Sequence, residues 1–207
     1  MFTRRTIMEA PVTPIETLHP FRMARMIAAL AALQAAHPAF AGGDWQVNPQ
    51  RTAIGFAVDA VGFPRTEGRF RRFEGRISVD FEHPDRSSVV FHVQSQSVDV
   101  GSPSFNDYVR SAAFLDSAQH PSIDFVSTSV NKISDHAVRV SGALTLLGVT
   151  KPISVDVTVL RAAAGGRQRL EFRAETRIDR LEFGMNSGFP LISRDVDLKI
   201  TSEAEEL

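Results

Sequence analysis

Histidine, serine and aspartate are the residues of this chain that could bind a metal or support nucleophilic catalysis, but their spacing favours neither. Beyond residue 41 the histidines are His83, His92, His120 and His136. They are too widely spaced to form the His-x-His or His-x-x-x-His patterns of metal sites. No serine stands in the Gly-x-Ser-x-Gly turn of a hydrolase nucleophile, and the chain has no cysteine. We therefore predict no catalytic residue, no metal and no cofactor.

The charge of the chain argues against nucleic-acid binding. The formal net charge is −1, and charged residues of both signs are spread along the sequence. A surface that attracts nucleic acid needs clustered lysine and arginine, so no nucleic-acid partner is expected. The pair Gly165-Gly166 lacks the helix and the lysine that follow a phosphate-binding loop.

The elements that would position any site are β-strands. From about Thr52 onward, apolar and polar residues alternate, as in Ile54/Phe56/Val58, so each strand has one apolar face. We expect strands near 52–60, 66–82, 87–99, 122–132, 136–147, 152–161, 168–179 and 194–204. A closed barrel removes the two open edges that a flat sheet of this size would expose. The sequence predicts an all-β fold, an eight-stranded antiparallel β-barrel with one short helical insertion.

Two segments interrupt the alternation, and one strand bends. Residues 101–121 predict a short helix capped by Ser104 that covers one mouth of the barrel. Residues 181–195 form a loop at a barrel rim that is too apolar for ordinary solvent exposure, so we expect it either to pack inward or to contact a ligand. The slip in the apolar period around Gly75 predicts a bulge, and Lys151-Pro152 is expected to belong to the turn that begins at Gly148.

The N-terminal segment predicts export. Arg22 and Arg25 precede a short apolar run, and Ala39-Phe40-Ala41 has the small residues of a cleavage site. The apolar run is too short for a permanent membrane span, which needs about 20 residues. We therefore expect residues 1–41 to be an extension with a signal peptide, translated from Met1 or Met23, and residues 42–207 to be the barrel. The protein is expected to be periplasmic or secreted after cleavage near Ala41.

Several motifs, in order along the chain, resemble the YceI-like family of secreted, lipocalin-like barrels. They are Trp45-Gln46-Val47-Asn48-Pro49, Gly68-Arg69-Phe70, Phe73-Glu74-Gly75, Phe114-Leu115-Asp116, His120-Pro121, Leu147-Gly148-Val149-Thr150-Lys151-Pro152, Ile178-Asp179-Arg180 and Phe183-Gly184-Met185. The resemblance covers almost all of residues 42–207. It implies a barrel that holds a polyisoprenoid, a quinone or another fatty-chain lipid along its axis.

Affinity for such a lipid would come mainly from removing methylenes from water, at about 25 cal/mol per Å². The chain has 15 phenylalanines against one tyrosine and one tryptophan, which suits an apolar lumen. We predict the lumen residues to be Phe56, Phe70, Phe91, Phe125, Phe172, Phe183 and Met185. The equally weighted alternative is that these side chains fill the barrel as core.

Asp107, Tyr108 and Arg110 on the helical insertion are predicted to hold the head group of the lipid at the mouth. Asp107 and Arg110 are three residues apart, so a solvent-exposed ion pair is the alternative. Asp179 and Arg180 are expected either to bind at the rim or to form a salt bridge there. Other hypotheses are an enzyme or redox accessory acting on the lipid, and a structural envelope protein. Both a monomer and a homodimer are compatible with the pattern.

Overall fold

The structure is a computed structural model that describes residues 43–164 and 167–206. The strands are β1 (Gly43–Val47), β2 (Ala53–Ala60), β3 (Phe63–Phe70), β4 (Phe73–Val79), β5 (Ser88–Gln94), β6 (Val98–Asp99), β7 (Ser122–Ser134), β8 (Ala137–Leu146), β9 (Val149–Ala164), β10 (Arg167–Asp179) and β11 (Ile192–Glu206). The helix is α1 (Pro103–Arg110), with short 3-10 turns η1 (Pro84–Arg86), η2 (Ser95–Ser97) and η3 (Arg180–Phe183). In this part of the chain, no helix is long and apolar enough to cross a membrane.

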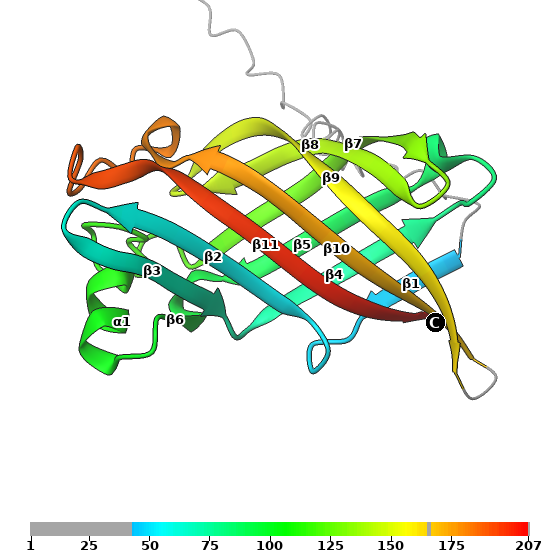
Figure 1. Cartoon of the computed structure of the whole chain (residues 1–207), viewed down its shortest axis with the longest axis horizontal. Helices are drawn as coiled ribbons and strands as arrows, with labels where there is room; N and C mark the ends of the chain where they lie inside the picture. Colours follow the sequence, from blue (N-terminus) through cyan, green and yellow to red (C-terminus); the bar gives the residue numbers. More distant parts are fainter. Residues whose placement is uncertain (1–42, 165–166, 207) are drawn as a thin grey trace, which may run out of the picture. The chain divides into compact units, whose positions relative to one another are not determined.

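The strands form one antiparallel sheet that closes on itself (Figure 1). Pairing runs through β1, β4, β5, β7, β8, β9, β10 and β11, and β11 pairs again with β1 to complete a ring of eight. The remaining strands extend this ring toward the end that carries α1. β2 continues β1 along β11, while β3 precedes β4 and pairs with β2 and β6. The predicted eight-stranded antiparallel barrel with one short helix is confirmed.

The break in the second predicted strand lies at Arg71 and Arg72, so the expected bulge at Gly75 is wrong. Both arginines are exposed, whereas Gly75 lies within β4 opposite Phe91. A Cβ atom at Gly75 would lie 2.7 Å from Cε1 of Phe91. Glycine therefore makes room here for a neighbouring ring and does not bend the strand.

Two local boundaries also differ from expectation. The helix begins at Pro103 after Ser102, not after Ser104, because the fixed φ of proline suits the first helical position. The β8–β9 turn is only Leu147-Gly148, with φ of 53° and 72°. Two residues are enough because a left-handed turn matches the twist of the strands. Lys151-Pro152 accordingly lies within β9.

Buried apolar side chains form two clusters against the barrel wall. The first gathers Trp45, Leu170 and Ala204 where β1, β10 and β11 meet. The second gathers residues such as Val98 and Phe183 near the end that carries α1. The strand alternation explains both, because every second side chain points inward.

Candidate functional site

The barrel encloses a cavity of about 1330 Å³. Its wall includes side chains from both ends: Phe63 and Leu191 beside α1, and Phe81 and His136 at the opposite end. The side chains between them are mostly Val, Ile, Leu and Phe on the inward positions of the strands. The protein therefore contains an apolar space that extends along the barrel, and its own side chains do not fill it.

Most of the predicted lumen residues lie on the cavity wall. They are Phe56, Phe70, Phe91, Phe125, Phe172 and Met185. The first two come from β2 and β3, and their rings are in contact, with centroids 5.6 Å apart. Phe172 is 9% exposed and also belongs to the first core cluster. These residues thus serve the core and the wall together, and their role toward a ligand stays a prediction.

Three of these rings lie directly over glycines. A Cβ atom at Gly68 would come within 2.3 Å of Cζ of Phe56, and one at Gly142 within 2.6 Å of Cζ of Phe125. Phe91 has the same relation to Gly75. Because glycine has no side chain, the ring takes up that space near the wall and not space at the centre of the barrel. These pairs help to explain why a barrel rich in phenylalanine keeps an open cavity.

Phe183 is placed differently from the prediction. It is 2% exposed and packs in the second core cluster with Val98 and Leu115, and it does not line the cavity. The reason is local geometry, because the chain turns through η3 directly after β10, whereas Met185, two residues later, reaches the wall. The predicted lumen role of Phe183 is therefore wrong.

The three predicted head-group residues on α1 do not converge. Tyr108 lines the cavity, is 52% exposed and contacts the ring of Phe114, with centroids 5.1 Å apart. Arg110 donates from Nη1 to Oδ1 of Asp107 over 3.2 Å and from Nη2 to the carbonyl oxygen of Val98 over 3.0 Å. Neither Asp107 nor Arg110 lines the cavity. The alternative of an i,i+3 ion pair is the arrangement that forms.

Arg180 has a structural role at the cavity wall that the sequence did not specify. It is 1% exposed, lies at the cavity wall and donates to three backbone carbonyls, of Ser193 (2.7 Å), Ile192 (2.9 Å) and Met185. Burial lowers the pKa of Arg180, while the charge of Asp179 opposes that shift. Arg180 thereby joins both ends of the loop between η3 and β11.

The expected salt bridge between Asp179 and Arg180 does not form. Asp179 accepts hydrogen bonds from Nε of Arg194 over 2.8 Å and from the N–H of Leu181 over 2.9 Å. The bond from Arg194 is the main reason that the pKa of Asp179 is lowered. The motif Ile178-Asp179-Arg180 pointed to these residues as part of the family pattern. A sequence does not show, however, which backbone carbonyls a side chain will bind.

The two ends of the cavity differ in polarity. At the end opposite α1, the wall includes Asp80, Lys132, Asp135 and His136. Nζ of Lys132 lies 2.8 Å from Oδ1 of Asp135. At the α1 end the wall includes Phe63, Phe105, Tyr108 and Leu191. An elongated apolar molecule would therefore meet Phe81 and an ion pair at one end, and several aromatic rings beside Arg65 and Glu67 at the other.

The cluster of Ser122, Asp124 and His92 is not arranged for nucleophilic catalysis. Oδ1 of Asp124 accepts from Oγ of Ser122 over 2.6 Å and lies 2.6 Å from Nδ1 of His92. The carboxylate stands between the hydroxyl and the imidazole, so His92 is not placed to take the proton of Ser122. Within residues 43–164 and 167–206, no group of three His, Cys, Asp or Glu side chains could hold a metal ion.

The sequence of this chain is similar to the sequences of known proteins. Protein YceI of Escherichia coli is 31% identical over 156 residues, which cover 74% of this chain and 81% of that protein. A UPF0312 protein of Vibrio cholerae is 32% identical over 164 residues, covering 77% and 87%.

Solved structures agree on the architecture. BcnA of Burkholderia cenocepacia has a TM-score of 0.70 and 23% identity, covering 76% of this chain and 98% of its own. A polyisoprenoid binding domain from Saccharophagus degradans has a TM-score of 0.65 and 16% identity, covering 79% and 98%. The model of the YceI-like domain matches residues 45–204. The resemblance inferred from the motifs is confirmed, and this chain belongs to the YceI-like family.

Proposed function

We propose that the protein binds a long apolar lipid, of the polyisoprenoid or isoprenoid-quinone class, along the axis of its barrel. The observation that carries this proposal is the apolar cavity of about 1330 Å³ with wall residues at both ends. Pockets for drug-sized ligands usually measure about 300–1,000 Å³. The larger volume favours a ligand with a long tail.

The dimensions of the strands support the same class of ligand. β10 has 13 residues and β9 has 16. At about 3.3 Å per residue and a tilt of about 40°, such strands extend about 30–40 Å along a barrel axis. A flexible hydrocarbon chain can follow a cavity of that length, and each buried methylene contributes about 0.8 kcal/mol.

A binding role is favoured over catalysis. The cavity wall is mostly aliphatic and aromatic. In the cluster of Ser122, Asp124 and His92, the carboxylate lies between the hydroxyl and the imidazole, so the imidazole is not placed to take the proton of the serine. The structural neighbour from Saccharophagus degradans is described as a polyisoprenoid binding domain, which supports the same ligand class here. We further propose that the protein acts as a carrier in the periplasm or outside the cell. The predicted signal peptide, which supports this location, lies outside the described residues.

Purification from the native host tests the proposal. Native mass spectrometry should reveal a protein mass increased by a bound hydrophobic molecule, and extraction with organic solvent should release a polyprenyl compound. The empty protein, prepared by delipidation, should take up a polyprenol from detergent solution in a 1:1 ratio. A protein that is recovered empty and fails to take up polyprenols or quinones would contradict the proposal. Export is tested separately by fractionating cells that express the full chain.

A further inference from the structure

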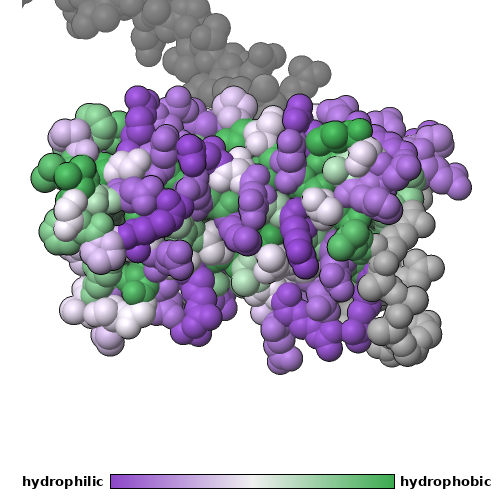
Figure 2. All heavy atoms as spheres, in the orientation of Figure 1, coloured by the Kyte–Doolittle hydropathy of each residue, from purple (hydrophilic) through white to green (hydrophobic). Residues whose placement is uncertain are grey.

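Large apolar side chains are exposed around the mouth of the barrel beside α1. We call this set the rim patch; it consists of Val61 (69% exposed), Phe63 (75%), Phe105 (38%), Tyr108 (52%), Phe189 (53%) and Leu191 (63%). The side chains come from three segments: the β2–β3 turn with the first residue of β3, then α1, and the loop before β11. Figure 2 shows hydrophobic residues at this end of the barrel and others toward the opposite end, whereas the middle of the visible face is largely hydrophilic.

The rim patch is continuous with the cavity. Phe63, Phe105, Tyr108 and Leu191 are exposed outside and also line the wall inside. An apolar molecule that enters here would pass from one set of apolar side chains to the next. At the opposite end the exposed wall residue Phe81 lies among charged groups, Asp80 and the Lys132–Asp135 ion pair, so the apolar surface there is smaller. Contiguous exposed apolar surface of this kind marks a binding surface for an apolar partner.

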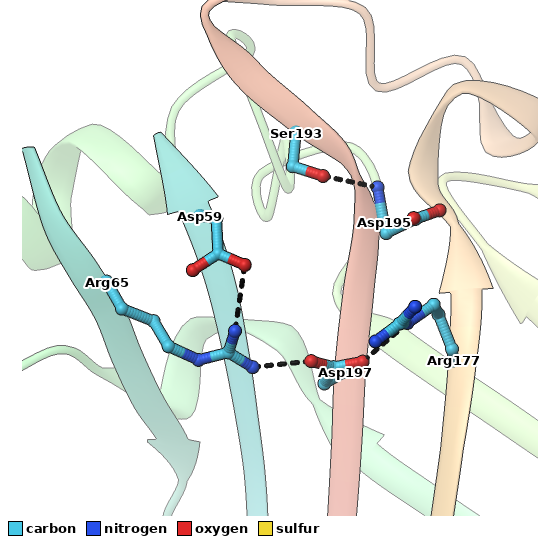
Figure 3. Close-up of polar contacts among 6 residues, drawn as sticks. All are labelled: Asp59, Arg65, Arg177, Ser193, Asp195 and Asp197. Atoms are coloured by element: carbon cyan, nitrogen blue, oxygen red, sulfur yellow. Dashed lines mark hydrogen bonds and ion pairs between the residues drawn. The ribbon is translucent and has the colours of Figure 1, made fainter. Parts of the chain in front are cut away.

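Three arginines near the rim patch are paired within the protein. Nη1 and Nη2 of Arg65 bind Asp59 over 2.8 Å and Asp197 over 2.5 Å (Figure 3). Arg110 binds Asp107 as described above, and Arg194 binds Asp179. An anionic membrane is attracted by unpaired lysine and arginine. The charge pattern here instead suits a surface without net charge.

We propose that the rim patch docks on the surface of a zwitterionic phospholipid bilayer, so that a lipid tail passes between bilayer and cavity without crossing water. The inference rests on the proposed lipid-binding function, and it adds the partner and the end of the barrel at which loading occurs. Apolar side chains from these three segments enter the interfacial layer, and the paired charges behind them stay in water.

Flotation with phosphatidylcholine vesicles tests the docking surface. The informative variant is Val61→Ser combined with Phe189→Ser, because both residues belong to the rim patch but do not line the cavity. The matched control is Val126→Ser combined with Ile133→Ser, which removes two exposed apolar residues from β7 away from the rim. We expect the wild type and the control to float equally in 0.1 M and 0.5 M NaCl. The rim variant should bind vesicles at least tenfold more weakly.

The outcomes separate docking from ligand binding. The rim variant should still take up a polyprenol from detergent, while its transfer of that polyprenol from vesicles slows by at least tenfold. Wild-type protein that does not float, a rim variant that floats normally, or flotation that requires phosphatidylglycerol and disappears in 0.5 M NaCl would each overturn the proposal. A dimer that becomes monomeric in the rim variant would also overturn it, because the patch would then be buried between two copies. Flotation without any polyprenol uptake would refute the proposed ligand and leave the docking surface intact.

Discussion

Replacing Gly68 with alanine tests whether a ring that lies over a glycine keeps the cavity open. Gly68 on β3 pairs with Phe56 on β2, and a Cβ atom at Gly68 would lie 2.3 Å from Cζ of that ring and 2.8 Å from Cγ1 of Val100. Both obstacles are side chains, so the backbone can stay in place while the ring turns about its rotamers. The nearest open space for the ring is the cavity that it already lines.

The expected effect is larger on binding than on stability. A phenyl ring turned into the lumen displaces about three methylenes of a bound tail, at about 0.8 kcal/mol each. The loss is therefore about 2.4 kcal/mol, or about 50-fold in Kd. Overpacking a filled core costs about 1–3 kcal/mol. Because open space relieves the contact at Phe56, we expect the free energy of unfolding to fall by less than about 1 kcal/mol.

Gly55→Ala is the matched control for this experiment. Gly55 lies one residue before Phe56 on β2, and a Cβ atom there would meet nothing closer than the carbonyl oxygens of Gly68 and Lys199 at 3.6 Å. This variant should bind like the wild type. The double variant Phe56→Ala/Gly68→Ala removes the displaced ring and should regain most of the lost affinity, because the two sites are in contact.

The assay is the Kd of a fluorescent polyprenol in mild detergent, with urea unfolding measured on the same samples. Wild-type affinity in Gly68→Ala would refute the idea that the ring over the glycine maintains the lumen. So would a loss of binding that the double variant fails to restore. A fall in unfolding free energy above about 3 kcal/mol would show that the ring has no free direction to turn.

Three further substitutions test other parts of the structure. Arg180→Met should lower the free energy of unfolding by about 3–5 kcal/mol in urea, because it leaves buried carbonyls without a donor; an effect below about 1 kcal/mol would contradict this role. The pKa of Asp99 is lowered to about 2, first by the N–H of Gly101 and then by Arg71, so its contribution is complete above about pH 4 and is lost as the pH falls toward 2. The difference in unfolding free energy between wild type and Asp99→Asn should accordingly shrink between pH 5 and pH 2, and a constant difference would refute the assignment. Ser117→Ala should be neutral or stabilising by up to about 1 kcal/mol in thermal unfolding, since Oγ of Ser117 is buried without a hydrogen-bond partner among the described residues; clear destabilisation would indicate a partner.

The barrel could be predicted from the sequence because its determinants are local. Alternation such as Glu171-Phe172-Arg173 indicates which side chains point inward, and it does so without knowledge of the partner strand. Closure then follows from the cost of open edges. The breaks within long strands were harder to locate, because the exposed pair Arg71-Arg72 differs little from ordinary outward residues.

The residues alone could not decide between an open lumen and a filled core, because the outcome depends on cross-strand register. Whether Phe56 lies flat on the wall depends on Gly68 standing opposite, and that pairing is set by the geometry of the turn between β2 and β3. The placement of Phe183 also required the path of η3. The partners of Arg180 are main-chain carbonyls, which every residue possesses. Sequence could therefore predict an apolar interior but not which side chains leave it open.

The same alternation governs the outer surface and the cavity, so the fold and the site cannot vary independently. On β10 and β11, Arg177 binds Asp197 over 2.7 Å on the outside (Figure 3). The adjacent Ile178, Val196 and Leu198 line the cavity. A one-residue slip in β11 would turn Asp197 inward and leave Arg177 unpaired. The ion pairs are exposed and contribute little stability singly. Their register nevertheless disfavours any pairing that would bring charge into the lumen, and this constraint keeps an apolar cavity compatible with a charged exterior.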